Sequence, residues 1–402
     1  MEFLFHRATP GGEGGVAVFE LYGEDAAAAL RSFFKPRQRG LPGEGQSRLG
    51  DVVERSGEPI DEAIVSHVTA AGMWSRLRAF TLSVHGGVWM QKRMAALLRE
   101  YGGVELHARG VLELAVKAKA LDAIQAAAHE LILEARTETG ARFLARQLTG
   151  ELSTRLRDGL SLLEEGRVRE AHSGLLDLLR ASQRAIRVCH PLRVLLAGRP
   201  NSGKSTLFNR LVAEERAVVT SLPGTTRDTL EELISVDDYP VILADSAGIR
   251  SPDGVGPVER QGILKVLARS DDAVIYLLPY PWDRTEDDRA FLRGVDPERL
   301  LLVASLADLA AEDVRPPIDL SVSGLTGRGL DDLRRRIIQR WIDDGADGAR
   351  PEREVPCAPF TAAQIRILSA ALEGIPAPPG VDVLRCTIIE CLRSSWPDGA
   401  CE

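Results

Sequence analysis

The sequence has few cysteines and no excess of basic residues, and each shortage excludes a class of protein. Its 402 residues include 5 cysteines, too few for a disulfide framework. Cys386 and Cys391 lie close together without a neighbouring Cys/His pair that would complete a zinc site, so we expect buried or inert thiols. Lys and Arg total 50 against 58 Asp and Glu, a formal charge of −8. This acidic balance gives no electrostatic basis for bulk nucleic-acid binding.

Long hydrophobic runs are also missing. No apolar run reaches the roughly 18–20 residues that a membrane span requires. Residues 1–7 lack the basic and apolar regions of a signal peptide. We therefore expect a cytoplasmic protein that does not associate with a membrane.

The composition that remains is typical of globular domains. Hydrophobic residues make up 44% and charged residues 27% of the chain, which excludes intrinsic disorder and permits a sizeable core. The length allows about two to three domains at roughly 100–200 residues each.

Four stretches differ in composition and hydrophobic pattern, and they define the expected domains. Residues 1–108 combine β-like runs at 16–19 and 80–84 with glycine-rich breaks, which indicates an N-terminal α+β domain. Within it, residues 35–58 are rich in glycine, proline and charge, so we expect a loop or a poorly ordered insert. Residues 109–190 carry leucines at helical spacing, a pattern typical of packing seams rather than of a cofactor site.

The rest of the chain alternates between strand and helix patterns and then ends in a helical tail. Between residues 191 and 342 the alternation predicts a largely parallel, doubly wound sheet. Its expected strands lie at 194–197, 241–244, 273–278 and 300–304. Residues 343–402 are expected to form a linker and a short C-terminal helical segment, with helices at 362–372 and 383–392.

The strongest local signal is the segment Gly198-Arg199-Pro200-Asn201-Ser202-Gly203-Lys204-Ser205, which fits G-x-x-x-x-G-K-[ST] between a strand and a helix. Its glycines let the backbone wrap a phosphate, and the loop N–H groups with the helix N-terminus supply positive potential. Lys204 is expected to reach the outer phosphates, and the Ser205 hydroxyl to bind Mg²⁺. The predicted nucleotide-binding residues of this loop are Asn201, Ser202, Gly203, Lys204, Ser205 and Thr206.

Two further elements follow at the distances expected of a GTPase-type switch. The run 222–228 contains Thr225 and Thr226 in the first connection after the loop's helix, where a threonine can complete the Mg²⁺ shell. Asp245 ends an apolar strand and begins a D-x-x-G that closes at Gly248. Its carboxylate would hold Mg²⁺ through water, and the Gly248 N–H would contact the γ-phosphate.

These three elements resemble the Era/EngA/MnmE group of translation-associated GTPases. Residues 8–16 look like the A-T-P-P-G-R-G-G-V start of the MnmE (TrmE) family, and residues 83–87 look like its H-G-G segment. The resemblance implies an α/β P-loop GTPase domain inserted in a helical domain and preceded by an α+β, tetrahydrofolate-binding-like domain. It also implies a homodimer, tRNA wobble-uridine modification and an MnmG-like flavoprotein partner.

The family resemblance also implies a mechanism. Ile249 stands where Ras-like enzymes carry a water-orienting Gln, and isoleucine cannot do that chemistry. Family members instead use a K⁺ ion bound when two GTPase modules meet. The matching potassium ligands are Asn201, Thr220, Leu222 and Thr225. Glu259 matches the glutamate that helps to orient water, so the implied catalytic residues are Glu259, Lys204 and Thr226. From the residues alone, Glu259 is better interpreted as an ordinary carboxylate at a helix start, and the catalytic role comes from the family resemblance.

The chain departs from the family where the guanine base is selected. The usual N-K-x-D is Ser305-Leu306-Ala307-Asp308, so only the aspartate remains to accept the guanine N1–H and N2–H₂ bonds. Two lost contacts worth about 1–1.5 kcal/mol each would weaken binding roughly tenfold to a hundredfold. Ser323 lies in an eroded S-A-[KR] element and is the other expected base-site residue.

Two further departures concern one-carbon and tRNA chemistry. Glu13 and Glu20 stand where the family usually carries arginine, and these carboxylates would repel the polyanionic tail of a tetrahydrofolate derivative. His85 either lines a ligand pocket or is a structural histidine with satisfied bonds. The sequence also lacks the family's C-terminal Cys-x-Gly-Lys.

We therefore expect an MnmE-like GTPase that uses GTP, Mg²⁺ and K⁺ and is associated with tRNA modification. Two alternatives remain open. One is a divergent nucleotide-binding switch or scaffold without folate or tRNA chemistry. The other is an Era/EngA-like ribosome-assembly GTPase, although those proteins append RNA-binding modules and the acidic tail here has no basic patch.

Overall fold

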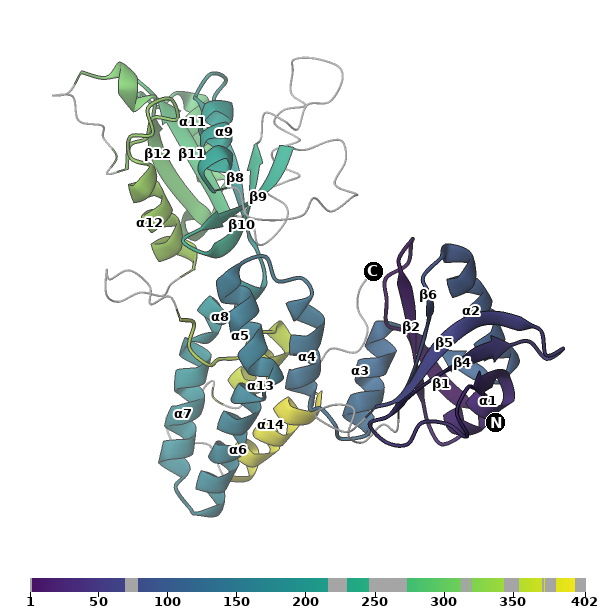
Figure 1. The fold of residues 1–402 in the computed structure, drawn as a ribbon. Helices are drawn as coiled ribbons and strands as arrows, with labels where there is room; N and C mark the ends of the chain where they lie inside the picture. Colours follow the sequence, from purple (N-terminus) through teal and green to yellow (C-terminus); the bar gives the residue numbers. More distant parts are fainter. Residues whose placement is uncertain are drawn as a thin grey trace. The chain divides into compact units, whose positions relative to one another are not determined.

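The computed structural model describes residues 2–68, 79–215, 230–245, 273–311, 318, 320–342, 354–370, 372 and 381–394. The chain divides into two compact units, Met1–Glu130 with Leu392–Glu402 and Leu131–Cys391. The first unit contains one sheet with its helices, and the second contains a helical region and another sheet (Figure 1).

The sheet of the first unit has the strand order β3-β4-β5-β6-β2-β1-β7. Its strands are β1 (Phe3–Arg7), β2 (Val16–Tyr22), β3 (Phe34–Pro36), β4 (Ser47–Val53), β5 (Pro59–His67), β6 (Ala79–His85) and β7 (Gly103–Glu105). The pairs are antiparallel except β1 with β7, which is parallel. The strands expected at 16–19 and 80–84 are thereby confirmed.

The core of this sheet follows from alternation along its strands. On β2, Ala17, Phe19 and Leu21 are fully buried, whereas the residues between them are partly exposed. The buried side chains form one cluster with residues of α1 (Ala26–Phe33) and α2 (Val88–Glu100). Tyr22 instead joins a second cluster with α3 (Ala108–Lys117), which precedes α4 (Ala123–Ile132).

The expectation of a loop over residues 35–58 was wrong for residues 47–53, although residues 37–46 and 54–58 do form connections between strands. Strand β4 lies inside this range and pairs with both β3 and β5. Its Gly50 suggested a break, but a Cβ there would lie 2.4 Å from the carbonyl oxygen of Lys35 and 2.7 Å from the ring of Phe34. The glycine is needed because β3 approaches this part of β4 so closely.

The helices of the second unit come from both sides of its sheet in the sequence. They are α5 (Glu138–Leu148), α6 (Glu151–Glu164), α7 (Val168–Arg180), α8 (Ser182–Cys189), α13 (Ala362–Ala370) and α14 (Val381–Ser394). Phe143 on α5 meets Phe360 edge-on, with ring centroids 5.8 Å apart, and α13 packs on α7. Leu152 and Leu156 of α6 are fully buried, so the expected leucine stripe is a packing seam.

The second sheet has the strand order β12-β11-β8-β10-β9. Its strands are β8 (Leu192–Gly198), β9 (Leu230–Val236), β10 (Tyr239–Asp245), β11 (Ala273–Pro279) and β12 (Leu300–Ser305). The helices that follow its strands are α9 (Lys204–Glu215), α11 (Glu286–Arg293) and α12 (Leu330–Trp341). Four strands run parallel, as predicted, while β9 is antiparallel to β10 and was not foreseen.

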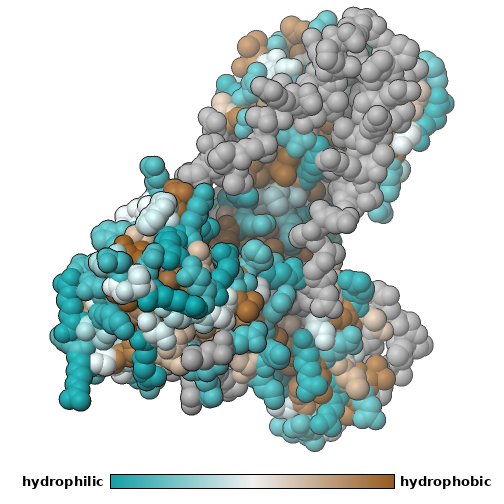
Figure 2. Space-filling model, turned by 90° about the vertical axis from the view of Figure 1, so that its right-hand side faces the viewer, coloured by the Kyte–Doolittle hydropathy of each residue, from teal (hydrophilic) through white to brown (hydrophobic). Residues whose placement is uncertain are grey.

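Among the residues that the structure describes, no helix is long and apolar enough to cross a membrane. On the face drawn in Figure 2, hydrophilic residues predominate among the coloured atoms and hydrophobic ones are scattered between them. Cys189 and Cys391 are buried, whereas Cys386 is exposed. Burial raises the pKa of Cys189 to about 12, which keeps this thiol protonated and inert.

Candidate nucleotide-binding site

The predicted phosphate loop connects the end of β8 to the start of α9. Its backbone is left-handed at Asn201 (φ 60°) and Gly203 (φ 84°) and has φ 148° at Gly198. A Cβ on Gly198 would lie 2.6 Å from the carbonyl oxygen of Leu277 and 2.7 Å from Ser202 Oγ. The loop therefore requires glycine at Gly198, and Asn201 is among the residue types that tolerate a positive φ.

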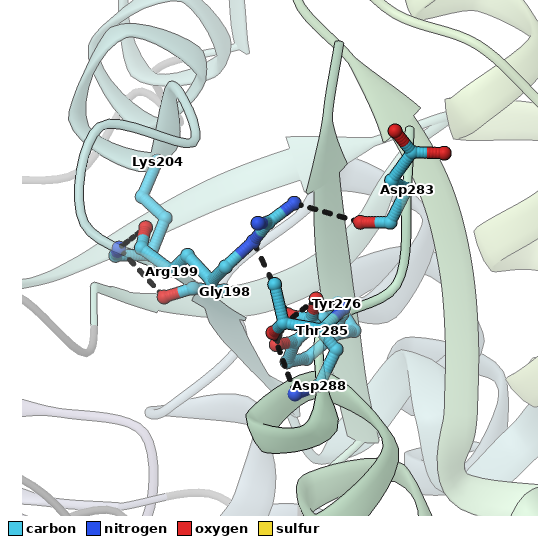
Figure 3. Close-up of polar contacts among 7 residues, drawn as sticks. All are labelled: Gly198, Arg199, Lys204, Tyr276, Asp283, Thr285 and Asp288. Atoms are coloured by element: carbon cyan, nitrogen blue, oxygen red, sulfur yellow. Dashed lines mark hydrogen bonds and ion pairs between the residues drawn. The ribbon is translucent and has the colours of Figure 1, made fainter. Parts of the chain in front are cut away.

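Lys204 lies at the centre of this loop. Its ammonium donates hydrogen bonds of 2.9 Å to the carbonyl oxygens of Gly198 and Arg199, as Figure 3 shows. The residue is only 8% exposed, so its charge is held in place rather than spread over many rotamers. A fixed ammonium beside a ring of loop N–H groups suits a polyphosphate.

Ser205 and Asp245 place two oxygen donors next to the loop. The Ser205 hydroxyl donates a 2.9 Å hydrogen bond to Asp245 Oδ2, and Asp245 is 1% exposed at the end of β10. A hydroxyl and a carboxylate at a phosphate loop are the ligands that Mg²⁺ uses with nucleotides. Ser202 Oγ is buried without a hydrogen-bond partner among the described residues, which leaves one polar atom for a ligand. These residues fit a nucleotide with Mg²⁺.

The eroded base element lies against the same loop. Leu306 has a left-handed backbone (φ 57°), and its Cδ2 is 3.1 Å from the position of a Cβ on Gly203. Asp308 follows on a short 3-10 helix, Ala307–Leu309, and is exposed. Ser323 is fully buried and accepts a 3.1 Å bond from the Thr326 N–H.

The segment around Ser323 is joined to β12 by backbone bonds. Ala307 N donates to Val322 O over 3.2 Å, and Val322 N donates to Ala304 O over 2.8 Å. The structure thus brings the loop, the Asp308 segment and the Ser323 turn together. Thr206 lies exposed in the first turn of α9.

Known proteins with similar sequences indicate the family of this chain. The sequence model of 50S ribosome-binding GTPases matches residues 193–304. The tRNA modification GTPase MnmE of Geobacter sulfurreducens is 30% identical over 85% of this chain and 82% of its own length. The MnmE of Parasynechococcus marenigrum is 32% identical over 91% of this chain and 88% of its own length.

The chain belongs to the MnmE family. It is a GTPase of that family, as the phosphate loop predicted. Among solved structures, the G domain of the FeoB iron transporter of T. maritima aligns with 38% of this chain and 99% of its own length, at 24% identity and a TM-score of 0.29.

Six residues predicted for the MnmE-type site lie outside the described residues. They are Thr220, Leu222, Thr225, Thr226, Gly248 and Glu259. Their roles in binding Mg²⁺, K⁺ or water remain predictions from the family resemblance.

Two of the N-terminal residues singled out in the sequence, Glu20 and His85, have hydrogen-bond partners within the first unit. Glu20 accepts a 2.5 Å hydrogen bond from the Tyr22 hydroxyl, while Glu13 is exposed. His85 is a surface residue whose Nδ1 lies 2.6 Å from Asp61 Oδ1, and its backbone N–H donates to the other oxygen of the same carboxylate over 2.8 Å. His85 is therefore a structural histidine with satisfied bonds.

One polar network beside the loop was missed by sequence reasoning. Arg199 Nη2 donates a 3.0 Å bond to the carbonyl oxygen of Asp283, and Arg199 Nε lies 3.4 Å from Asp288 Oδ1. Asp288 is fully buried and caps α11, where Thr285 completes a capping box. The T-x-x-D spacing from Thr285 signals that cap, but no local signal links it to Arg199.

Asp288 remains a carboxylate because of these contacts. Burial acts to raise its pKa, but the bond from the Tyr276 hydroxyl (2.5 Å), the bonds from Thr285 (2.7 and 2.8 Å) and the Arg199 charge outweigh it and leave the pKa below its ordinary value. A charged group thus lies next to the guanidinium of the phosphate loop (Figure 3).

Proposed function

We propose that this chain binds GTP with Mg²⁺ at residues 198–205 and hydrolyses it in a K⁺-stimulated reaction that serves tRNA wobble-uridine modification. The observation that supports the phosphate chemistry is the placement of Lys204, whose ammonium lies across two loop carbonyls beside the Ser205–Asp245 pair. Family membership supports the output, because the relatives are tRNA modification GTPases.

Each residue of the site would have a role that follows from its chemistry. Lys204 would neutralise the outer phosphates, and Ser205 with Asp245 would hold Mg²⁺. Mg²⁺ held by these two residues would supply positive charge against the negative charge that develops on the phosphates. Thr226 would complete the Mg²⁺ shell, and Glu259 would orient the attacking water.

The K⁺ ligands in this proposal are those that the family resemblance implies. They are Asn201, Thr220, Leu222 and Thr225. Asn201 supports the assignment because its left-handed backbone places it on the rim of the phosphate loop, where it is exposed. An ion at this rim would add positive charge beside the phosphates.

Base recognition in the proposal depends on Asp308, with Ser323 stabilising the neighbouring turn. An exposed carboxylate can accept both the N1–H and the N2–H₂ of guanine. Leu306, which contacts the loop at Gly203, would pack on the base in place of the usual lysine stem.

The organisation is proposed on the same basis. We infer an N-terminal domain at 1–108, a helical domain from 109–190 and 343–402, and a GTPase domain at 191–342 inserted into it. The Phe143–Phe360 contact and the packing of α13 on α7 support a helical domain built from two separate segments. A cytoplasmic homodimer that works with an MnmG-like flavoprotein and tRNA completes the proposal. It includes no folate chemistry, because Glu13 and Glu20 would repel a folate tail.

The test is phosphate release from GTP and Mg²⁺, measured in K⁺ and in Na⁺. We expect turnover that is faster in K⁺ and that disappears in Lys204→Ala, while Lys117→Ala, an exposed lysine of α3, behaves as the wild type. Absence of turnover in both salts would refute the enzymatic proposal.

A second candidate is a nucleotide-binding switch or scaffold without turnover. Ser305 and Leu306 favour it, since they remove two of the usual base contacts. Titration with fluorescent GTP separates the two candidates, because tight binding with no phosphate release supports only the scaffold.

A further inference from the structure

The connection between β11 and α11, residues 280–285, contacts two parts of the nucleotide site at once. On one side, its Asp283 carbonyl accepts a 3.0 Å hydrogen bond from Arg199 of the phosphate loop. On the other side, Trp282 Nε1 and Tyr280 N donate to the Ser305 carbonyl over 3.0 and 3.2 Å. Ser305 opens the base element, so this connection lies between the phosphate and base ends of the site.

Arg199 is held through both its side chain and its main chain. Its carbonyl oxygen accepts a hydrogen bond from Lys204 Nζ, while its guanidinium is fixed by Asp283 and Asp288 (Figure 3). A guanidinium fixed at two points limits the freedom of its own backbone. The position of the Lys204 ammonium therefore depends on the anchor at the far end of the arginine.

The anchor itself is well ordered by its surroundings. Asp288 is fully buried and accepts hydrogen bonds from the Tyr276 hydroxyl and from the backbone and side chain of Thr285. Buried carboxylates with several donors hold one geometry because any other leaves a charge unsatisfied.

The base element has few polar contacts of its own with the loop. Ser305 Oγ is buried and has no hydrogen-bond partner among the described residues, and the Leu306 side chain lies beside Gly203, with Cδ2 3.1 Å from the position of a Cβ there. Trp282 is 5% exposed and packs in a cluster with Leu278 and Ala304. The main-chain carbonyl of Ser305 thus accepts the hydrogen bonds that hold this residue to the connection.

We propose that Arg199, Asp288 and Trp282 are positioning residues of the nucleotide site, which fasten the phosphate loop and the base element to the connection 280–285. The identity of the ligand, GTP, rests on the proposed function. The contacts that fasten the loop and the base element are present in the protein without ligand. None of the three residues is required to touch the nucleotide.

Hydrogen–deuterium exchange of the nucleotide-free chain tests the fastening directly. Arg199→Met removes both anchors but keeps an unbranched apolar side chain, and Asp288→Asn removes the charge but keeps an acceptor for the helix cap. We expect both to speed exchange of the 198–205 amides about tenfold or more, because Arg199→Met loses the hydrogen bond to Asp283 and the ion pair with Asp288, and Asp288→Asn loses that ion pair. Arg293→Met, an exposed arginine of α11 paired with Glu286, is the matched control and should change nothing. Unchanged loop exchange in both variants would overturn the proposal.

Trp282→Phe tests the base side of the connection. It keeps an aromatic ring and removes the indole donor to the Ser305 carbonyl. We expect faster exchange over residues 305–309 and little change over 198–205. If residues 305–309 exchanged at the same rate in Trp282→Phe as in the wild type, Trp282 would not be a positioning residue.

GDP binding then separates positioning from direct contact. If Arg199 only positions the loop, Arg199→Met and Asp288→Asn should each speed GDP dissociation about tenfold, and the double variant should be no worse than either single one. If Arg199 contacts phosphate itself, Asp288→Asn would release the guanidinium and leave GDP affinity unchanged or tighter, which contradicts the proposal. Faster loop exchange together with no GTP binding by the wild type would refute the proposed function and leave the fastening intact.

Discussion

At the scale of single residues, the strongest departure from the family pattern lies in the base element. Leu306 adopts a left-handed backbone that few side chains other than glycine, asparagine and aspartate adopt readily. Backbone bonds on both sides of Leu306, from Val322 N to Ala304 O of β12 and from Ala307 N to Val322 O, hold it there. The strain is retained at a functional position, as is common where a backbone must present a side chain. In the proposed site, Asp308 would then be the main source of base selection.

Asp308 should therefore set the base preference. We predict that Asp308→Asn weakens GTP binding about tenfold to a hundredfold, because a carboxylate that accepts two hydrogen bonds is lost. The same variant should bind xanthosine triphosphate more tightly than the wild type, since the new amide can donate to the xanthine carbonyl. Competition with a fluorescent nucleotide measures both. Asp331→Asn, an exposed carboxylate at the start of α12, is the control. A GTP affinity unaffected by Asp308→Asn would exclude this residue from the base site.

His85 gives a prediction about pH. Its hydrogen bond with Asp61, the charge of that carboxylate and a smaller effect of Glu62 raise the pKa of His85 above its ordinary 6.5. Because the folded-state pKa is raised, the pair stabilises the first unit fully below pH 6.5, and this stabilisation is lost as the pH rises through the folded-state pKa.

An NMR titration of the His85 ring checks that direction. The midpoint should lie above 6.5 and fall in Asp61→Asn, whereas Glu58→Gln, an exposed carboxylate in the connection between β4 and β5, should leave it in place. A midpoint at or below 6.5 in the wild type would show that the pair does not form.

At the scale of secondary-structure elements, the close approach of the 321–324 turn to α9 controls the phosphate loop. A Cβ on Gly324 would lie 2.8 Å from Leu207 N, and that N–H donates to Gly203 O over 2.9 Å. We predict that Gly324→Ala displaces the first turn of α9, costs about 1–3 kcal/mol of unfolding free energy and weakens nucleotide binding. Urea unfolding and GDP titration measure the two effects.

Gly174→Ala is the control for that variant. It lies inside α7, and a Cβ there would meet nothing within 4 Å. Removing a glycine from a helix interior should stabilise the protein by about 0.5–1 kcal/mol. If Gly324→Ala lowered neither the unfolding free energy nor GDP affinity, as expected of Gly174→Ala, the turn would not be in close contact with α9.

Elements of strong and regular pattern could be predicted from the sequence. The parallel strands of the second sheet are apolar runs between helices, and β8, β10, β11 and β12 lie where those runs predicted them. Strand β4 was missed because Gly50, a breaker by local rules, is required by contacts with another strand. A requirement of that kind depends on tertiary packing, which local composition does not reveal.

At the scale of the whole molecule, the candidate site also contains residues that local sequence predicts and residues that only the tertiary structure brings together. The phosphate loop is one contiguous motif, so Lys204 and Ser205 could be assigned from sequence, and a strand end brought Asp245 to them. Arg199 and Asp288 belong to elements that meet only in the fold, and neither residue type is unusual at its position. Such a pair becomes visible only when β8 and β11 are placed side by side.

The division into two compact units leads to the last prediction. The nucleotide site lies entirely in the unit Leu131–Cys391, so a ligand should stabilise that unit alone. GDP with Mg²⁺ at about 100 times its dissociation constant adds about 2.7 kcal/mol, which corresponds to roughly 5–10 °C in the melting temperature of a unit of this size. Calorimetry should therefore show two transitions, of which only one moves with GDP. In Lys204→Ala neither should move. A wild-type protein whose two transitions both rise with GDP would instead show that the stability of the first unit is coupled to nucleotide binding.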